Sequence, residues 1–307
     1  MKKRAFDITP GSCLAGKWNG HTYTIIKKLG SGACGIVFLC RSSQGDTYAL
    51  KVGEDSSRMM MEVNMLKKFS KVQGAKLGPS FVDVDDWVSP DRKTHPFYVM
   101  EYIDGVPLKH FLKGKSKEWV GIIAIQLLSD LENLHNEGYV FGDLKTDNLL
   151  IGNSRVRWID VGGVTATGRA IKEYTEFYDR GYWGRGSRKA EPTYDLFAVT
   201  MILLEMSYPK RFEKGNHPEK TLEAKLSASP LLKPYRKIIQ QCWMGKIQDA
   251  AEMKNKFSSI LLKRSGKRSS SRMQKRLTTQ ESDNVELAAL SLMAGVVFGV
   301  SIFSFWI

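Results

Sequence analysis

The chain has 307 residues, and its 46 lysines and arginines outnumber its 32 aspartates and glutamates, which gives a formal net charge of +14. The four cysteines, Cys13, Cys34, Cys40 and Cys242, show neither a C-x-x-C pair nor a metal-ligand spacing, which argues against a disulfide framework and a zinc site and favours a reduced compartment. The length is enough for a large core, and the excess of cations favours a partner rich in phosphate.

Strand and helix patterns follow one another along the chain. Runs rich in β-branched and aromatic residues predict strands near residues 22–30, 35–41, 46–52, 80–87 and 97–102. Helical spacing of apolar residues predicts helices near residues 57–70, 107–113, 117–138, 192–207, 220–227 and 231–244. The helix of residues 117–138 has a broad apolar face and is expected to be buried. Residues 89–96, which include two prolines, are expected to form a turn.

A glycine-rich segment with G-x-G-x-x-G-x-V spacing lies between the first two predicted strands. The residues expected to contact a nucleotide there are Gly30, Ser31, Gly32, Ala33, Cys34, Gly35 and Val37. Glycines let the backbone approach phosphate oxygens closely. A strand pattern follows, whereas a dinucleotide-binding turn would open a helix, so the segment indicates a hairpin over a nucleotide. On its own, such a pattern is more often an ordinary loop.

A lysine and a glutamate follow at the positions that a phosphate site requires. The strand YALK ends in Lys51, which would neutralise the α- and β-phosphates, and Ala49 is also expected to contact the nucleotide. Glu62 lies in an amphipathic stretch and could pair with Lys51 across the site. Only 11 residues separate the two, so the connection between strand and helix must be short.

The segment YVFGDLKTDNLLI, residues 139–151, is the most informative part of the sequence. It places Asp143, Lys145 and Asn148 at fixed offsets, and a strand-like run then leads to Asp160. Phosphoryl transfer needs a group that orients the acceptor hydroxyl and oxygen ligands for a metal on the phosphates. Asp143 fits the first role, and Asn148 and Asp160 fit the second, with Mg²⁺ (or Mn²⁺) as the ion.

In this order the motifs resemble those of the Hanks-type bacterial Ser/Thr protein kinases, over about residues 20–262. With the apolar C-terminus, the chain is similar to the small tail-anchored kinases of spore-forming bacteria. The resemblance implies an α+β, bilobal fold with a β-rich N-lobe at about residues 21–100 and a larger helical C-lobe at about residues 104–262. It also implies ATP as cofactor, protein substrates that include the kinase itself, and a role in sporulation.

The resemblance assigns further residues. Met100, Glu101 and Ile103 resemble the hinge that binds adenine through its backbone. Lys145 would reach both the catalytic aspartate and the transferring phosphoryl group. Asp195 resembles the aspartate that begins the central helix of the large lobe and braces the catalytic segment.

The sequence departs from the family pattern in three places. The H-R-D motif reads Phe141-Gly142-Asp143, so the arginine that binds a phosphorylated activation loop is missing. The D-F-G motif reads Asp160-Val161-Gly162, in which valine can still fill an apolar slot. No clear A-P-E motif follows, and Asp179 is the candidate to replace its glutamate.

Two other kinds of protein remain open at this point. Small-molecule kinases of the aminoglycoside or choline type also have glycine before the catalytic aspartate, but they usually lack a lysine at the position of Lys145. A pseudokinase scaffold would bind nucleotide without turnover, and retention of the lysine, aspartates and asparagine argues against it. Lys145 and the glycine-rich segment favour a protein kinase.

The flanks of the kinase-like region differ from it in composition. Residues 1–20 form an N-terminal extension that lacks the apolar core of a signal peptide. Residues 263–284 are basic and rich in serine and threonine, and are expected to be a disordered linker. From residue 287 to residue 307 there are 21 residues without a charge, enough for a helix of about 31 Å across a bilayer core. Residues 285–307 are therefore expected to be a transmembrane helix.

The basic linker predicts both topology and partners. Its seven cations at residues 263–276 predict a cytoplasmic kinase domain on a single-pass protein of the cell membrane. The same residues could bind anionic lipid or, without sequence preference, DNA. Either polyanion could gather two copies and promote phosphorylation in trans. The plain alternative is that the cations only determine topology.

Overall fold

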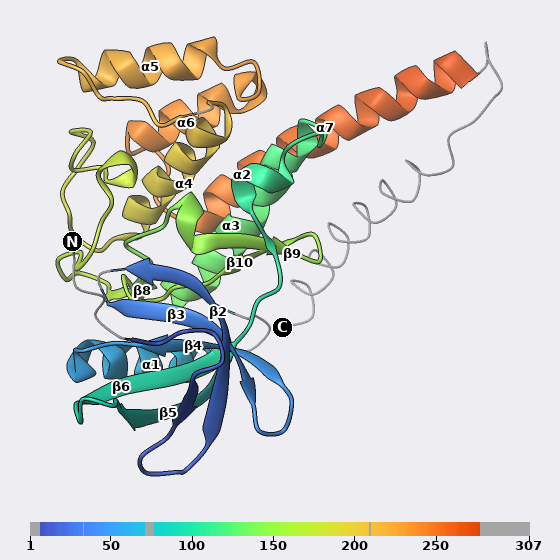
Figure 1. Cartoon of the computed structure of the whole chain (residues 1–307). Coiled ribbons are helices and arrows are strands. Elements are labelled where there is room, and N and C mark those ends of the chain that lie inside the picture. The colour runs from blue at the N-terminus through green and yellow to red at the C-terminus, as the bar shows by residue number, and fades with distance from the viewer. Residues whose placement is uncertain (1–6, 33, 71–76, 209, 277–307) are drawn as a thin grey trace. The chain divides into compact units, whose positions relative to one another are not determined.

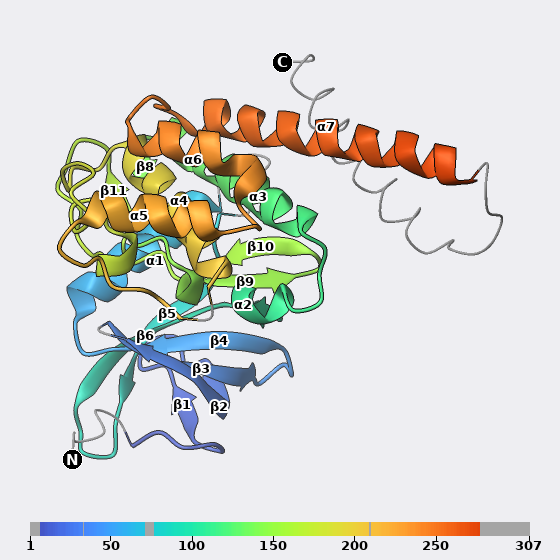
Figure 2. The same ribbon diagram turned by 90° about the horizontal axis from the view of Figure 1, so that it is seen from above.

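The computed structural model of the chain describes residues 7–32, 34–70, 77–208 and 210–276 (Figure 1). The chain divides into two units, Met1–Leu261 and Leu262–Ile307. Within the first unit, the sheet and helix α1 lie on one side and helices α3 to α6 on the other (Figures 1 and 2). This arrangement confirms the predicted small β-rich lobe and larger helical lobe.

The small lobe is built on one antiparallel sheet of six strands in the order β1-β2-β3-β4-β6-β5. The strands are β1 (Cys13–Ala15), β2 (Thr22–Gly32), β3 (Gly35–Ser42), β4 (Thr47–Val52), β5 (Phe81–Val88) and β6 (Thr94–Glu101). Alternate residues such as Ile25, Leu50 and Phe97 are buried together on one face. Strand β1 comes from the expected N-terminal extension, which therefore contributes to the sheet.

Helix α1 (Ser56–Phe69) covers the other face of this sheet. It begins after Asp55, whose side chain accepts hydrogen bonds from the backbone N–H groups of Ser57 (2.9 Å) and Arg58 (3.1 Å), as an N-cap residue does. Its buried residues recur at helical spacing, and one of them, Glu62, is charged. A buried carboxylate needs a partner, and the site described below supplies one.

The helical lobe is arranged around α4 (Pro192–Met206), which is buried on nearly all sides. Its apolar sequence has no polar stripe, as expected of a helix at the centre of a core. The helices around it are α2 (Leu108–Phe111), α3 (Glu118–Asn136), α5 (Pro218–Ala228), α6 (Arg236–Trp243) and the start of α7 (Ala250–Arg276). The prediction of a buried helix at residues 117–138 is confirmed by α3.

Short strands at the base of the large lobe hold the segment that carries the catalytic motif. Strand β8 (Tyr139–Val140) pairs with β11 (Thr165–Ala166), and β9 (Leu149–Gly152) pairs with β10 (Arg155–Trp158) and with β7 (Val106–Pro107). The β9–β10 turn is tight because Asn153 and Ser154 both have positive φ. Residues 141–148 are therefore fixed at both ends.

Three predicted boundaries need correction. Strand β6 begins at Thr94 rather than at residue 97, because the turn before it is closed by hydrogen bonds between the backbones of Ser89 and Lys93 (2.9 Å) and of Arg92 and Ser89 (2.8 Å). Helix α6 begins at Arg236 rather than at residue 231, after a 3₁₀ turn at Lys233–Tyr235.

Helix α7 continues to Arg276, so residues 263–276 are helical and not a disordered linker. The reason is that these residues contain no proline, and Lys, Arg, Gln and Met are good helix formers.

The rest of the expected C-terminal organisation falls on residues 277–307, which lie outside the described part of the chain. This includes the expected transmembrane helix at residues 285–307. Among the helices that the structure describes, none has the length and apolar character needed to span a bilayer.

Candidate active site

A buried ion pair joins the sheet to helix α1. Lys51, on β4, places its Nζ 2.6 Å from Oε2 of Glu62, and only 5% and 3% of the two residues are exposed. Tyr98, on β6, donates a second hydrogen bond to the same oxygen at 2.7 Å. Burial alone would lower the pKa of Lys51, but the carboxylates of Asp160 and Glu62 outweigh it and raise that pKa above its usual value. Lys51 therefore remains a cation in the site.

Asp160 lies beside this pair at the start of the activation segment, defined here as residues 160–179. Its Oδ1 is 4.0 Å from Nζ of Lys51 and accepts a hydrogen bond from the Gly162 backbone at 2.9 Å. The Asp160 side chain is 46% exposed, so it faces open space rather than the core. Val161 is buried in the main apolar cluster, which agrees with its expected place in the family's D-F-G position.

The catalytic motif forms a second cluster around Asp143. The ammonium of Lys145 pairs with Oδ2 of Asp143, and the Thr175 hydroxyl donates to Oδ1 at 2.9 Å. Lys145 also donates to the Thr175 hydroxyl at 3.3 Å. The side-chain amide of Asn148 donates to the backbone carbonyl of Asp143 at 3.0 Å. Thr175 thus links the activation segment to Asp143.

The two clusters meet at Gly163, three residues after Asp160. A Cβ atom at Gly163 would lie 2.9 Å from Cβ of Asp143 and 3.0 Å from its backbone nitrogen. Glycine is therefore needed for the activation segment to pass beside Asp143. This close approach brings Lys51, Glu62 and Asp160 to the same region as Asp143 and Lys145.

Residues 141–148, which carry the family's catalytic motif and are called the catalytic segment below, are held by hydrogen bonds to the start of helix α4. Asp195 is fully buried and accepts hydrogen bonds from the backbone N–H groups of Phe141 (2.7 Å) and Gly142 (3.0 Å). His135 lies 2.9 Å from the same carboxylate through its Nε2. Asp195 thus has the contacts expected of the bracing aspartate, and His135 is a further hydrogen-bond partner of its carboxylate.

Gly142 has a backbone conformation that excludes a side chain. Its φ is +82°, and a Cβ atom would lie 2.7 Å from the carbonyl oxygen of Gly163. An arginine at this position would be strained by the backbone and would collide with the activation segment. The local fold therefore explains why this chain has glycine where the family pattern has arginine.

The glycine-rich segment and the expected hinge occupy neighbouring strands. Gly30, Ser31 and Gly32 end β2, Gly35 and Val37 lie on β3, Cys34 lies in the turn between them, and Ala33 is outside the described residues. Gly35 has φ +139°, and a Cβ there would lie 2.2 Å from the carbonyl oxygen of Val52. The Cys34 thiol donates to Oε1 of Glu173 at 3.7 Å, and burial raises its pKa.

The hinge residues follow directly on the sheet. Met100 is opposite Ala49 in the β4–β6 register, and both are buried, as is Ile103. The Glu101 side chain pairs with Arg157 (Oε2–Nη2, 3.0 Å) and accepts from Ser80 at 3.1 Å. The Glu101 carboxylate is thus engaged by Arg157 and Ser80, and the Glu101 backbone N–H donates to the Ser80 carbonyl at 2.8 Å.

A second polar network, which the sequence did not suggest, connects the catalytic segment to Glu205 near the end of α4. The Thr146 hydroxyl donates to Oε2 of buried Glu205 at 2.8 Å, and Tyr178 donates to the same oxygen. Arg211 Nε donates to Oε1 of Glu205 at 3.0 Å. Burial alone would raise the pKa of Glu205, but its donors outweigh burial and lower that pKa. Only the tertiary structure brings these residues together, so no local motif could have revealed them.

Asp179 is a buried structural carboxylate. It accepts hydrogen bonds from Nε of Arg188 (2.8 Å) and from the hydroxyl of Tyr194 (2.9 Å), and only 1% of the residue is exposed. These contacts fasten the end of the activation segment to the large lobe. They are the kind of contact expected if Asp179 replaces the glutamate of the A-P-E motif.

Comparison with known proteins agrees with this geometry. Residues 23–285 match the protein kinase domain family. The chain is 51% identical over 253 residues to the serine/threonine-protein kinase YabT of Bacillus subtilis (strain 168), a match that covers 81% of this chain and 75% of that protein. It is 26% identical over 208 residues to the probable serine/threonine-protein kinase YbdM of the same organism, covering 64% of this chain and 74% of that protein. The chain therefore belongs to the protein kinase family, and it is a serine/threonine protein kinase.

Proposed function

We propose that this kinase transfers the γ-phosphoryl group of ATP, bound with Mg²⁺ (or Mn²⁺), to serine and threonine hydroxyls of protein substrates and of a second copy of the chain. One observation carries the proposal. The buried Lys51–Glu62 pair lies beside Asp160, and the activation segment then passes directly against Asp143 at Gly163. A cation for phosphates, oxygen ligands for a metal and a carboxylate for the acceptor are thus brought to one place.

The residues present fit a magnesium ion. Protein sites for Mg²⁺ often supply only one or two oxygens and leave the rest to phosphates and water. Asp160 offers a partly exposed carboxylate, and Asn148 donates its amide nitrogen to the Asp143 carbonyl, which turns its amide oxygen away from that carbonyl. These two residues would hold the ion, which when bound supplies positive charge to the phosphates.

Asp143 is suited to orient the acceptor hydroxyl. An ionised carboxylate has about four lone-pair sites, and the described contacts from Thr175 and Lys145 place one donor on each oxygen. Each oxygen therefore keeps a lone pair for the incoming hydroxyl. Lys145 holds the carboxylate in place and neutralises charge that develops during transfer.

The test of this function uses the full chain, labelled ATP, a generic basic protein and a panel of small alcohols. We expect labelled phosphoserine and phosphothreonine on the protein and on the kinase, with no transfer to the alcohols. Asp143→Asn and Lys51→Ala should each reduce transfer by about two to four orders of magnitude. Transfer to an alcohol and not to protein would support a small-molecule kinase instead.

We also propose that residues 285–307 anchor the kinase in the cell membrane with its catalytic domain in the cytoplasm. The proposal is supported by the uncharged 21-residue stretch and by the seven cations that precede it. Fractionation of cells that express the full chain, or the chain ending at residue 284, tests it. The full chain should sediment with membranes and resist extraction at high pH, whereas the shorter chain should be extracted.

A further inference from the structure

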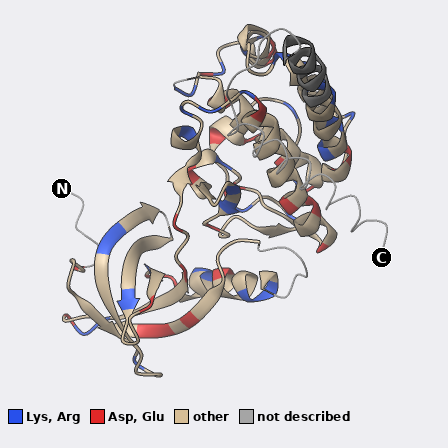
Figure 3. Ribbon diagram, turned by 90° about the vertical axis from the view of Figure 1, so that its right-hand side faces the viewer, with Lys and Arg blue, Asp and Glu red and all other residues tan. Residues whose placement is uncertain are grey.

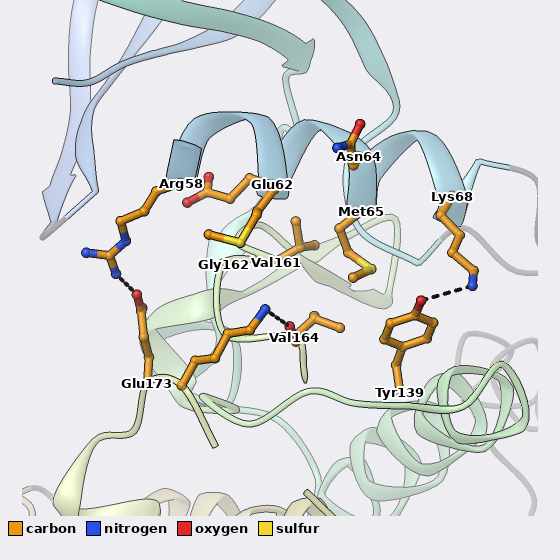
Figure 4. A pocket seen from close by; sticks show the side chains of 12 residues that line it. Arg58, Glu62, Asn64, Met65, Lys68, Tyr139, Val161, Gly162, Val164 and Glu173 are labelled. Atoms are coloured by element: carbon orange, nitrogen blue, oxygen red, sulfur yellow. Dashed lines mark hydrogen bonds and ion pairs between the residues drawn. The ribbon is translucent and has the colours of Figure 1, made fainter. Parts of the chain in front are cut away.

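A cavity separates helix α1 from the activation segment. It has a volume of about 490 Å³ and is lined by Arg58, Met65 and Lys68 of α1, by Tyr139 of β8, and by Val164 and Glu173 of the activation segment (Figure 4). Because this space is open, α1 is not fixed to the large lobe by close packing along this face. Residues such as Leu66 still pack α1 into the main core cluster, and on the cavity side its position also depends on the contacts that cross the cavity.

Two polar contacts cross it, one near each end of α1 (Figure 4). At the start of the helix, the Arg58 guanidinium pairs with Oε1 of Glu173. Near its end, Lys68 Nζ donates to the Tyr139 hydroxyl at 3.0 Å and lies 4.4 Å from the centre of that ring. The first contact connects α1 directly to the activation segment.

Glu173 lies at the junction of three parts of the active site. Arg58 precedes Glu62 by one helical turn, so an anchor on Arg58 also fixes the carboxylate that holds Lys51. Two residues after Glu173, Thr175 donates to Asp143. The Cys34 thiol, in the turn of the glycine-rich hairpin, donates to Oε1 of Glu173 at 3.7 Å.

From this geometry, we propose that Glu173 is a positioning residue, whose carboxylate holds α1 through Arg58 and the glycine-rich hairpin through Cys34 in the arrangement that phosphoryl transfer needs. It supplies a permanent negative charge on the activation segment, where Gly142 leaves no arginine to read a phosphoryl group. The inference rests on the proposed function, because it assigns Lys51, Glu62 and Asp143 to catalysis.

The contact is suited to influence an equilibrium rather than to stabilise the whole fold. Arg58 and Glu173 are 38% and 31% exposed as side chains, so salt screens their attraction. A modest loss of this attraction is enough to shift α1 between a position that pairs Glu62 with Lys51 and one that does not. We therefore expect an effect on activity that depends on salt and leaves the melting temperature nearly unchanged.

The experiment uses the full chain with Glu173→Gln, Arg58→Gln and the charge reversal that combines Arg58→Glu with Glu173→Arg. Glu54→Gln, which removes an exposed carboxylate shortly before α1, is the matched control. The kcat and the KM for ATP are measured on a generic basic protein over a salt series, together with the melting temperature. Ratios of wild type to variant at each salt concentration remove the effect of salt on substrate binding.

We expect each single change at Glu173 or Arg58 to lower kcat/KM by about three- to tenfold at low salt, with a ratio that approaches one as salt rises. The charge reversal should recover most of the activity, because it restores the ion pair with α1 although not the weaker contact with Cys34. A melting temperature that stays unchanged in the single variants separates this positioning role from a merely structural one. If Glu173→Gln behaves like Glu54→Gln, or if the reversal is no better than the single changes, the inference is wrong. An inactive wild type would instead count against the proposed function itself.

Discussion

At residue 142 the backbone has a conformation that only glycine adopts without strain. Its positive φ turns the chain so that the N–H groups of Phe141 and Gly142 both point at Asp195. The same turn brings the Gly163 carbonyl to the place where a Cβ would lie. One residue thus fixes the catalytic segment on α4 and removes the usual means of sensing loop phosphorylation.

Replacement of Gly142 by alanine should be far more harmful than the same change at Gly138. Both glycines have φ near +80°, but a Cβ at Gly138 would meet no atom within 4 Å, whereas one at Gly142 would meet the Gly163 carbonyl at 2.7 Å. Gly138→Ala should cost only the backbone strain of about 1–2 kcal/mol. Gly142→Ala should also displace the activation segment, and kcat should fall by about tenfold or more. Equal kcat values in the two variants would contradict the structure here.

The hydroxyl of Thr175 is expected to matter for catalysis rather than as a site of regulation. It donates to Asp143 and accepts from Lys145. Loss of a hydrogen bond to a charged group typically costs about 1.5–3 kcal/mol, so Thr175→Ala should lower kcat by about tenfold to a hundredfold. Thr175→Ser should retain most activity, because it keeps the hydroxyl.

The control for this prediction is Thr167, which is exposed on the same segment. Since Gly142 provides no arginine for a phosphorylated loop, Thr167→Ala should behave like wild type in steady-state assays. Thr165 is less useful, because it is buried and its hydroxyl donates to the Gly163 carbonyl at 2.9 Å. A large loss in Thr167→Ala would show that loop phosphorylation does control this kinase.

The residues that the sequence revealed share one property: their spacing along the chain is set by local structure. Asp143, Lys145 and Asn148 lie within six consecutive residues, and Lys51 is the last residue but one of a recognisable strand. The missed residues act across the fold. Tyr98 reaches Glu62 only because β6 lies beside β4, and Glu173 meets Arg58 only because the activation segment passes under α1. No sequence pattern encodes those distances.

At the scale of elements, the predicted bounds of helices and strands are accurate where the apolar pattern is strong. Where no such pattern exists, elements were missed or misjudged. The buried helices α3 and α4 begin and end within about two residues of their predicted bounds. Strands of two to four residues, such as β7 and β8, are too short to show a pattern. The polar half of α7 has no apolar stripe, so composition suggested disorder although its residues favour a helix.

One contact between elements makes stability depend on pH. Burial raises the pKa of Asp130, on α3, to about 6, although Arg155 of β10 partly opposes this by pairing with it at 3.0 Å. Because the folded pKa lies above the unfolded value, this carboxyl contributes stability at low pH that is lost as pH rises through about 6. A shift of about two units corresponds to about 3 kcal/mol.

Asp130→Asn removes this titration and keeps an oxygen that can accept from Arg155. We expect the variant to gain stability relative to wild type as pH rises from about 4.5 to about 7, by about 2 kcal/mol. Urea unfolding of both proteins over this pH range measures the difference. A difference that stays constant over this range would show that folding does not raise the pKa of Asp130 above its unfolded value.

At the scale of the whole chain, the distribution of charge separates the catalytic part from its C-terminal extension. Lysines and arginines, as well as aspartates and glutamates, occur on the ribbon of each lobe (Figure 3). Residues 263–276 contain seven cations and no acidic residue, so they hold half of the net charge of +14. In the structure these residues form the second part of α7, which is described as far as Arg276.

We expect DNA or anionic lipid to stimulate autophosphorylation through this basic segment. The test compares the full chain in neutral detergent with a variant in which its seven cations are glutamine: Lys263, Arg264, Lys267, Arg268, Arg272, Lys275 and Arg276. The matched control replaces seven exposed lysines of the large lobe by glutamine: Lys113, Lys115, Lys117, Lys220, Lys233, Lys237 and Lys246. Wild type and control should be stimulated at low salt, and the segment variant should keep only its basal activity.

The dependence of DNA affinity on salt and the dependence of stimulation on polyanion concentration identify how the polyanion acts. The logarithm of affinity for DNA should fall with the logarithm of salt, and the slope should become shallower by about 0.9 for each phosphate that the variant no longer neutralises. If two kinases must share one polyanion, stimulation should rise and then fall as polyanion is added, because an excess separates the copies. A steady rise to a plateau would indicate instead that the polyanion acts on single kinases. If neither polyanion stimulates the wild type at low salt, the segment serves only in topology and as a tether.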